Sequence, residues 1–214
     1  MADPIPTLSA LEARVLGTLV EKQRTVPDTY PLSLNALVAG CNQKSSRHPV
    51  IEAGEAEILQ AIDALKEFGL VCEVSGSRVV RFGHALESVL AIPKQASALL
   101  TVLLLRGPQT AGELRLNCER LHKFADISSV EAFLEELASR ADGGLVVELP
   151  RLPGSRENRW MHLLAGPVVL EAEAGGRSVA GSASQEIGQL RTRVELLECE
   201  VQALRELFAE LASK

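Results

Sequence analysis

Apolar and polar residues alternate with helical spacing along much of the chain, and the same order of elements occurs twice. A first helix is predicted to begin after Ser9, because Glu12 completes a capping box three residues later. Its counterpart is predicted after Pro93 and ends at Gly107 and Pro108. The apolar stripes of these two helices are Leu8, Leu11, Val15, Leu16, Leu19 and Val20 in the first half, and Leu99, Leu100, Val102, Leu103 and Leu104 in the second.

Two further helices are predicted in each half. Ser33 precedes the second helix of the first half, and Thr110 with Glu113 caps its counterpart. Ser128 and Glu131 are expected to cap the last helix of the second half. The stripes are Leu34, Leu37, Val38 and Cys41, then Ile58, Ile62 and Leu65, in the first half, and Leu114, Cys118 and Leu121, then Val130, Leu134 and Leu137, in the second.

A β-hairpin is predicted after each third helix. The segment VCEVSGSRVVRF has its turn at residues 75–77, and LVVELPRLPGSRENRWMHLL has its tip around residues 153–154. Three helices followed by a hairpin is the order of a winged helix-turn-helix. The sequence therefore predicts a mainly α fold with small β-hairpins (α+β), built from two tandem winged helix-turn-helix domains, residues 1–88 and 89–166.

The C-terminal part of the chain has a different pattern. Residues 167–186 are rich in Gly, Ala and Ser, which predicts a flexible linker, and a heptad repeat over residues 187–214 predicts a coiled-coil helix. β-Branched residues at the a positions with Leu at d favour a parallel homodimer. The alternative is that this helix folds back on its own second domain. The predicted dimer seam is Ile187, Leu190, Val194, Leu197, Val201, Leu204, Phe208 and Leu211.

Composition restricts the classes of partner. The formal net charge of −6 gives no general affinity for polyanions, so any contact with nucleic acid must come from a local patch. Aromatic residues are only 3% of the chain, so stacking platforms for single strands are not expected. The strongest apolar stretch, residues 99–105, is too short to cross a bilayer, and the N-terminus lacks a signal-peptide pattern. We therefore expect a cytoplasmic protein without a membrane partner.

The sequence shows no pattern typical of an enzyme. Its four histidines stand singly, its four cysteines form no CxxC pair, and no GxGxxG, Walker or GxSxG motif is present. We expect no catalytic residue, no cofactor and no metal site, and structural roles for the cysteines.

The turn between the second and third helices is about five residues longer in the first half than in the second, if the flanking helices align. This segment, CNQKSSRHPVIEAG, is polar, basic and rich in hydroxyl groups. Two interpretations stay open, namely phosphate contacts or a solvated loop whose side chains cap its own turns. The candidate phosphate contacts are Lys44, Ser45, Ser46, Arg47 and His48.

Arginines in the two hairpins are further candidates for contacts with a DNA backbone or minor groove, with ordinary solubilising charge as the alternative. The third helices carry mainly carboxylates on their polar faces, so they are not expected to make base-specific contacts in the major groove. Trp160, by contrast, is expected in the core. The arginine candidates are Arg78 and Arg81 in the first hairpin, and Arg151, Arg156 and Arg159 in the second.

The string CNQKSSR at residues 41–47 lies between LSALEARVLGTLVEK and AIDALKEFGLV, and in this setting the chain resembles the bacterial YceH family. The resemblance extends from about Leu8 through the second hairpin into the tail helix. It implies tandem winged helices in a family whose biochemical role is unassigned.

Two interpretations of function follow. The first is a DNA-associated regulator that contacts double-stranded DNA, mostly at phosphates, through residues 44–48 and the hairpins. The second is an adaptor that binds a protein partner through acidic winged-helix surfaces and the C-terminal helix.

Overall fold

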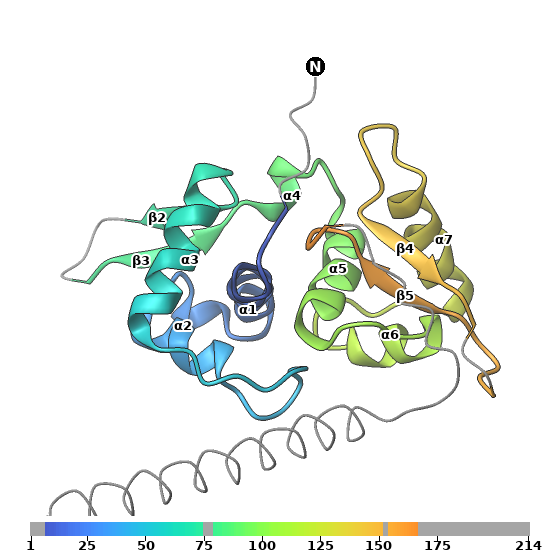
Figure 1. Ribbon diagram of the computed structural model, residues 1–214, viewed down its shortest axis with the longest axis horizontal. Helices are drawn as coiled ribbons and strands as arrows, with labels where there is room; N and C mark the ends of the chain where they lie inside the picture. Colours follow the sequence, from blue (N-terminus) through green and yellow to red (C-terminus); the bar gives the residue numbers. More distant parts are fainter. Residues whose placement is uncertain (1–6, 75–78, 152–153, 167–214) are drawn as a thin grey trace, which may run out of the picture. The chain divides into compact units, whose positions relative to one another are not determined.

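The computed structural model describes residues 7–74, 79–151 and 154–166. The chain divides into two units, Met1–Val168 and Val169–Lys214, and every described residue belongs to the first unit. The described part contains seven α-helices, one short 3-10 helix and two small antiparallel sheets (Figure 1). The α+β class expected from the sequence is therefore confirmed. The linker and the predicted dimer seam from Ile187 to Leu211 lie outside the described residues, and so does Arg78.

The first half places three helices before a hairpin. Ser9 and Glu12 form the expected capping box at the start of α1, and the Ser33 hydroxyl accepts a hydrogen bond from the backbone N–H of Ala36 at the start of α2. In chain order the elements are α1 (Ala10–Thr25), η1 (Pro27–Thr29), β1 (Leu32–Ser33), α2 (Leu34–Cys41), α3 (Glu55–Glu67), β2 (Val71–Val74) and β3 (Arg81–His84).

The second half repeats this order after a short connecting helix. Thr110 and Glu113 form the expected capping box, and Gly107 ends the preceding helix with φ of 75°, a value that favours glycine. The elements are α4 (Leu86–Val89), α5 (Lys94–Arg106), α6 (Ala111–Asn117), α7 (Ile127–Ala138), β4 (Val146–Leu149) and β5 (Arg159–His162).

One predicted cap is wrong. Asp126, not Ser128, is the N-cap of α7: its carboxylate accepts a hydrogen bond of 2.7 Å from the backbone N–H of Ser129. The Ser129 hydroxyl in turn accepts from the backbone N–H of Asp126 at 3.4 Å. The helix therefore begins one residue before the predicted cap, because an aspartate two positions upstream offers the same type of hydrogen bond.

The repeat includes a pairing that the apolar pattern did not predict. In the first half β1 pairs with β3, with Leu32 opposite Phe82, and the sheet order is β1-β3-β2. In the second half a single bridge joins Gln109 to Trp160 at the equivalent place, beside the two-stranded sheet β4-β5. Each hairpin is thus tied to the residues just before the second helix of its own half. Trp160 is buried, as expected.

The two halves share one hydrophobic core, and α1 and α5 lie side by side at its centre (Figure 1). Eight consecutive residues of α1, from Ala13 to Val20, and ten of α5, from Ala96 to Leu105, are buried. Each of these helices is covered by its own half and by the other, which explains burial on every face. Helices α1 and α5 approach each other closely at Gly17, where a Cβ would lie 3.0 Å from Leu105 Cδ2.

Candidate phosphate-binding face

The loop between α2 and α3, residues 42–54, is held in place by polar side chains. The Asn42 side-chain amide donates to the carbonyl of Ala53 at 2.8 Å and accepts from its N–H at 2.9 Å. Arg14, buried in α1, donates to the carbonyls of Cys41 at 3.1 Å and Pro49 at 2.6 Å. The elaborated loop therefore has a fixed course, and its outward side chains keep defined positions.

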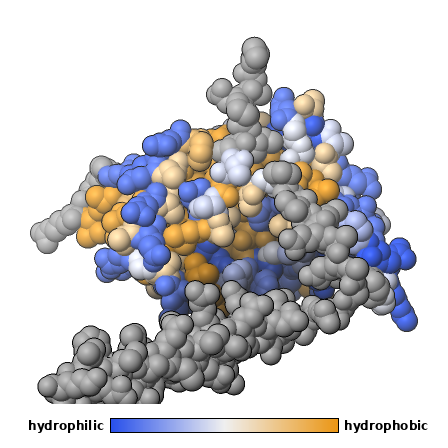
Figure 2. Space-filling view, viewed as in Figure 1, coloured by the Kyte–Doolittle hydropathy of each residue, from blue (hydrophilic) through white to orange (hydrophobic). Residues whose placement is uncertain are grey.

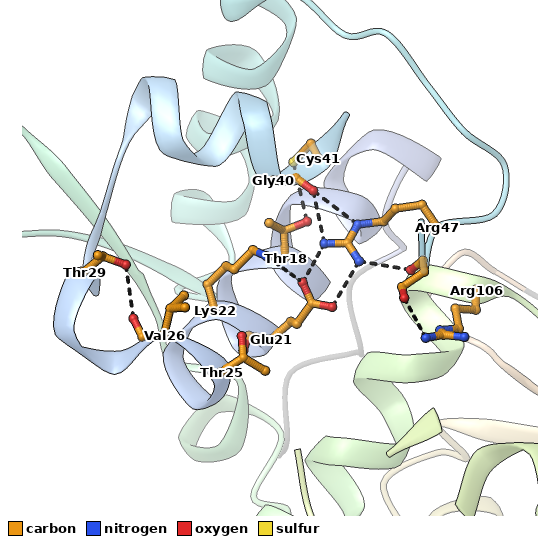
Figure 3. A network of polar contacts seen from close by, with 11 residues as sticks. Thr18, Glu21, Lys22, Thr25, Val26, Thr29, Gly40, Cys41, Arg47 and Arg106 are labelled. Atoms are coloured by element: carbon orange, nitrogen blue, oxygen red, sulfur yellow. Dashed lines mark hydrogen bonds and ion pairs between the residues drawn. The ribbon is translucent and has the colours of Figure 1, made fainter. Parts of the chain in front are cut away.

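Arg47 points into the protein (Figure 3). Its side chain is 0% exposed, and its guanidinium makes a bidentate pair with Glu21 of α1, at 2.6 and 3.1 Å. It also donates to the carbonyl of Gly40 at 3.0 and 3.2 Å. The prediction of Arg47 as an exposed phosphate contact is therefore wrong, because its charge is paired inside the fold.

Charges around this pair fix the ionisation of the Glu21 carboxyl. Burial alone would raise the pKa of Glu21, but hydrogen bonds and charge from Arg47, together with Lys22 at 3.4 Å, hold that pKa below its usual value. Burial and the nearby charge of Arg47 lower the pKa of Arg14, which stays a cation as arginines do. The loop is thus anchored by two buried arginines and one ionised carboxylate.

Ser46 turns outward from this anchor and contacts the second half. Its φ of 60° lies in the left-handed region that non-glycine residues seldom adopt. Its hydroxyl accepts a hydrogen bond of 2.8 Å from Arg106, the last residue of α5 (Figure 3). Arg106 also donates to the side-chain carbonyl of Asn117 at 2.8 Å, and Asn117 donates to Gln109 at 2.5 Å. Both partners of the Arg106 guanidinium are neutral, so its positive charge is not cancelled by a direct contact.

Between the two halves lies a groove of about 210 Å³. The first half contributes the end of α1 and the outward part of the loop, and the second half contributes the ends of α5 and α6. Burial lowers the pKa of Arg106, whose guanidinium remains charged. The charged, amide and hydroxyl side chains that line the groove are Glu21, Lys22, Thr25, Gln43, Ser45, Ser46, Arg106, Asn117 and Arg120.

The remaining predicted loop contacts lie at the surface. Lys44, Ser45 and His48 are exposed. The backbone N–H of His48 donates to the carbonyl of Leu105 at 2.8 Å, so the loop is joined to α5 there as well. Lys44 and Ser45 make no hydrogen bond or ion pair within the residues that the structure describes.

The two hairpins differ in their arginines. Arg81 donates to the carbonyls of Pro31 at 2.8 Å and Thr29 at 3.4 Å, so it ties β3 to the preceding turn. Arg151, Arg156 and Arg159 are exposed, and none of their side chains has a hydrogen bond or ion pair within residues 7–74, 79–151 and 154–166. Of the two hairpins, the second is therefore the one whose described arginine side chains are unpaired.

Helix α6 connects the groove to this second hairpin. At its C-terminal end Asn117 contacts Arg106, and near its N-terminal end a Cβ on Gly112 would lie 3.8 Å from Glu157 Oε2 at the hairpin tip. The loop, α6 and the hairpin tip follow one edge of the molecule, the lower edge in Figure 1. The two segments that carry the remaining candidate contacts therefore lie along the same edge, although they are distant in sequence.

The third helices present acidic surfaces. Glu55, Glu57 and Asp63 on α3 are exposed, and so are Glu135 and Glu136 on α7. Carboxylates repel phosphates, so neither helix is suited to lie in a DNA groove. The prediction that these faces are acidic and solvent-exposed is confirmed.

Sequence patterns gave no indication of Arg106, Arg120 or Asn117 as site residues. Arg106 ends the most apolar stretch of the chain, and the hydroxyl that it contacts is 60 residues away. The sequence does place arginine and asparagine at the ends of α5 and α6. Polar residues at helix ends are usually ordinary surface residues, so helical periodicity alone does not mark them as a binding site.

Across the described ranges, no three His, Cys, Asp or Glu side chains are grouped so that they could hold a metal ion. A search of the same residues finds no helix with the length and apolar character needed to cross a membrane.

Comparison with known proteins gives a consistent family match. The family model described as "Protein of unknown function, DUF480" matches residues 8–155. A UPF0502 protein of Dechloromonas aromatica (strain RCB) is 71% identical over 210 residues, which cover 98% of each chain. UPF0502 proteins of Cupriavidus necator and Burkholderia thailandensis are 61% and 59% identical, over 96% and 98% of this chain and 83% and 90% of their own lengths. The resemblance to the YceH family is consistent with these matches.

Proposed function

The chain belongs to the DUF480 family of proteins of unknown function, and we propose a function from the residues themselves. The protein is a non-catalytic tandem winged-helix protein that binds the phosphates of double-stranded DNA. The twice-repeated order of three helices and a hairpin supports the winged-helix assignment. Free thiols at Cys41, Cys72 and Cys118 fit a reducing compartment such as the cytoplasm.

One observation carries the DNA proposal: within the described residues, cations on the α2–α3 loop, near the ends of α5 and α6 and on the second hairpin make no ion pair with a carboxylate. Four of these cations are exposed arginines, which suit phosphate contacts because the guanidinium offers several donors in a fixed geometry. Glu157 lies at the hairpin tip among them and reduces the local charge without pairing with any of them. We call this set the cationic face: Lys44, Arg106, Arg120, Arg151, Arg156 and Arg159.

The acidic faces of α3 and α7 define how the duplex is bound. A major-groove interaction would bring Glu55, Glu57 or Glu135 close to phosphates, which repulsion opposes. The cationic face instead meets the sugar–phosphate backbone, where contacts fix position and carry little sequence information. Binding is therefore expected to depend strongly on salt and weakly on sequence.

The predicted coiled-coil helix, residues 187–214, completes the proposal. A parallel homodimer through the seam from Ile187 to Leu211 supplies two cationic faces in one particle. Two linked faces bind one duplex more tightly than a single face, because the second contact becomes intramolecular. The heptad pattern supports this step, and its residues lie outside the described part of the chain.

Charge reversal on the second hairpin tests the proposal. Fluorescence anisotropy with a labelled random-sequence duplex compares the wild type with Arg156→Glu and with Lys94→Glu. Lys94 is exposed at the first turn of α5, the end of that helix opposite Arg106, so its reversal is a matched control. We expect Arg156→Glu to weaken binding at least tenfold and Lys94→Glu to change it less than threefold. Equal effects of the two reversals, or no binding by the wild type at low salt, would reject the proposal.

A second candidate function is supported by the first hairpin. Its exposed residues include Val74, Val79 and Val80, and Phe68 at the end of α3 is 41% exposed. Figure 2 shows apolar surface gathered over this end of the molecule. An apolar surface beside acidic helices suits a protein partner, as the adaptor interpretation requires. If Val80→Ser left duplex binding intact and abolished a co-purifying partner, the protein would have both functions.

A further inference from the structure

The groove between the two halves has the size and lining of a site for a small anion. Its volume of about 210 Å³ lies below the roughly 300–1,000 Å³ of pockets that hold drug-sized organic ligands. Such pockets are mostly apolar, whereas this lining combines cations, hydroxyls and amides with four apolar side chains, those of Val26, Val102, Leu105 and Leu121. A compact group with several acceptor oxygens fits this lining better than an extended organic molecule.

The groove has an excess of positive charge. Its lining contains one carboxylate, Glu21, which is already paired with Arg47 at 2.6 Å and Lys22 at 3.4 Å. Arg106 makes hydrogen bonds to neutral groups only, and Arg120 has no hydrogen bond or ion pair within the described part of the chain. Within the described residues, these two guanidinium groups therefore line the groove without a carboxylate in direct contact, and the charge of Glu21 acts on Arg106 from further away.

Uncharged donors stand beside these cations. The Ser46 hydroxyl accepts from Arg106, which leaves its own hydrogen available, and Ser45 and Gln43 make no hydrogen bond among the described residues. All three belong to the loop whose course is fixed by Asn42 and Arg47. Because the backbone of this loop is already ordered, ligand binding there costs little conformational entropy, as in other preorganised sites.

We infer that this groove binds one phosphate group, held by Arg106 and Arg120 and by the donors of Gln43, Ser45 and Ser46. The ligands come from both halves, so a bound phosphate bridges the loop of the first half and the ends of α5 and α6 in the second. The inference rests in part on the proposed function, since both arginines belong to the cationic face. The phosphate is a group of the DNA backbone or of a free phosphorylated small molecule, and the chemistry of the site is the same for both.

Thermal unfolding of the full-length protein with inorganic phosphate tests the site, with sodium chloride of equal ionic strength as the reference. We expect Tm to rise by roughly 3–6 °C at a tenfold excess of phosphate over its Kd, and to continue rising with the logarithm of phosphate concentration. Arg120→Gln is expected to weaken phosphate binding at least tenfold, since it removes a charge-assisted contact. Lys94→Gln, the loss of one charge at an exposed residue outside both the groove and the cationic face, is expected to keep the full rise.

The variants separate a specific site from general charge effects. Arg120 is exposed and has no partner within the described residues, so Arg120→Gln is expected to fold with an unchanged far-UV circular dichroism spectrum. No rise beyond the chloride reference in the wild type, or an equal rise in Arg120→Gln, would overturn the inference.

Competition identifies the source of the phosphate and separates the two proposals. If saturating phosphate displaces a labelled duplex from the wild type at constant ionic strength, the site binds the DNA backbone. If phosphate raises Tm while duplex binding is unchanged or absent, the ligand is a free phosphorylated molecule. In the case without any duplex binding, the DNA proposal fails and the phosphate site stands. Duplex binding without a phosphate-dependent rise in Tm would overturn the site and leave the DNA proposal intact.

Discussion

The buried pair between Arg47 and Glu21 gives a direct test of how the α2–α3 loop is held. Glu21→Gln keeps the shape of the side chain and removes its charge. One amide oxygen still accepts from the guanidinium, but the amide NH₂ group then faces a second donor of Arg47. The perturbation leaves a buried cation with a single neutral side-chain acceptor and the carbonyls of Gly40 and Ser46.

The expected cost follows from the burial of the two partners. Removal of one member of a buried ion pair costs about 3–5 kcal/mol. The Arg47 side chain is 0% exposed and that of Glu21 is 16% exposed, so water reaches only the acidic partner and the lower end of this range applies. A loss of about 3 kcal/mol corresponds to a fall in Tm of roughly 6–12 °C for a chain of this length.

Urea and thermal denaturation followed by far-UV circular dichroism measure this loss. Asp63→Asn is the matched control, because it removes the same kind of charge from an exposed pair with Lys66 at 3.3 Å. That change is expected to cost less than about 1 kcal/mol. The pKa of Glu21 is lowered in the folded state, so its stabilisation is present above the usual carboxyl pKa and is lost as pH falls. The difference between wild type and Glu21→Gln should therefore shrink in acid. A loss for Glu21→Gln no larger than that for Asp63→Asn would refute the role of the pair as the anchor of the loop.

Three further outcomes are expected. Gly40→Ala places a Cβ 2.7 Å from Thr18 Cγ2 and should lower the free energy of unfolding, measured in urea, by about 1–3 kcal/mol. The control Gly112→Ala has no atom nearer than 3.8 Å to its Cβ and should be neutral or stabilising by up to about 1 kcal/mol. Equal effects of the two changes would contradict the close packing of α2 on α1. Burial lowers the pKa of His162 to about 4, so as pH falls this histidine takes up a proton in the unfolded chain before it does so in the folded one. Stability should therefore decrease below about pH 6.5, by about 3 kcal/mol at pH 4. An identical pH profile for His162→Leu would show that this histidine does not contribute. Truncation before Gln185 should convert a dimer to a monomer in analytical ultracentrifugation, and an unchanged association state would reject the heptad prediction.

Local sequence rules were sufficient for most of the fold. Capping residues such as Ser9 and Thr110 and the apolar stripes act over three or four positions, so they predict helices without tertiary information. They failed at the start of α7, where Asp126 with Ser129 and Ser128 with Glu131 are equally good patterns. The choice between the two N-caps depends on how the whole helix packs, and local sequence rules do not describe that packing.

The candidate site was only partly predictable, for a different reason. The string CNQKSSR pointed to a loop that lines the groove, but composition does not say which side of an irregular loop faces inward. Arg47 turns toward Glu21, and its neighbours Lys44 and Ser45 turn outward, because α1 supplies a carboxylate on one side only. Arg106 joins the site through a contact across 60 residues, which periodicity cannot reveal.

The salt dependence of duplex binding tests the central claim most directly. The cationic face contains six candidates, so if three to six phosphates are neutralised, log Kobs should fall against log salt with a slope between about −3 and −5. Two duplexes of unrelated sequence should give the same slope and affinities within about threefold, because the contacts are with the backbone. A slope near zero, or binding to one duplex alone, would contradict the account.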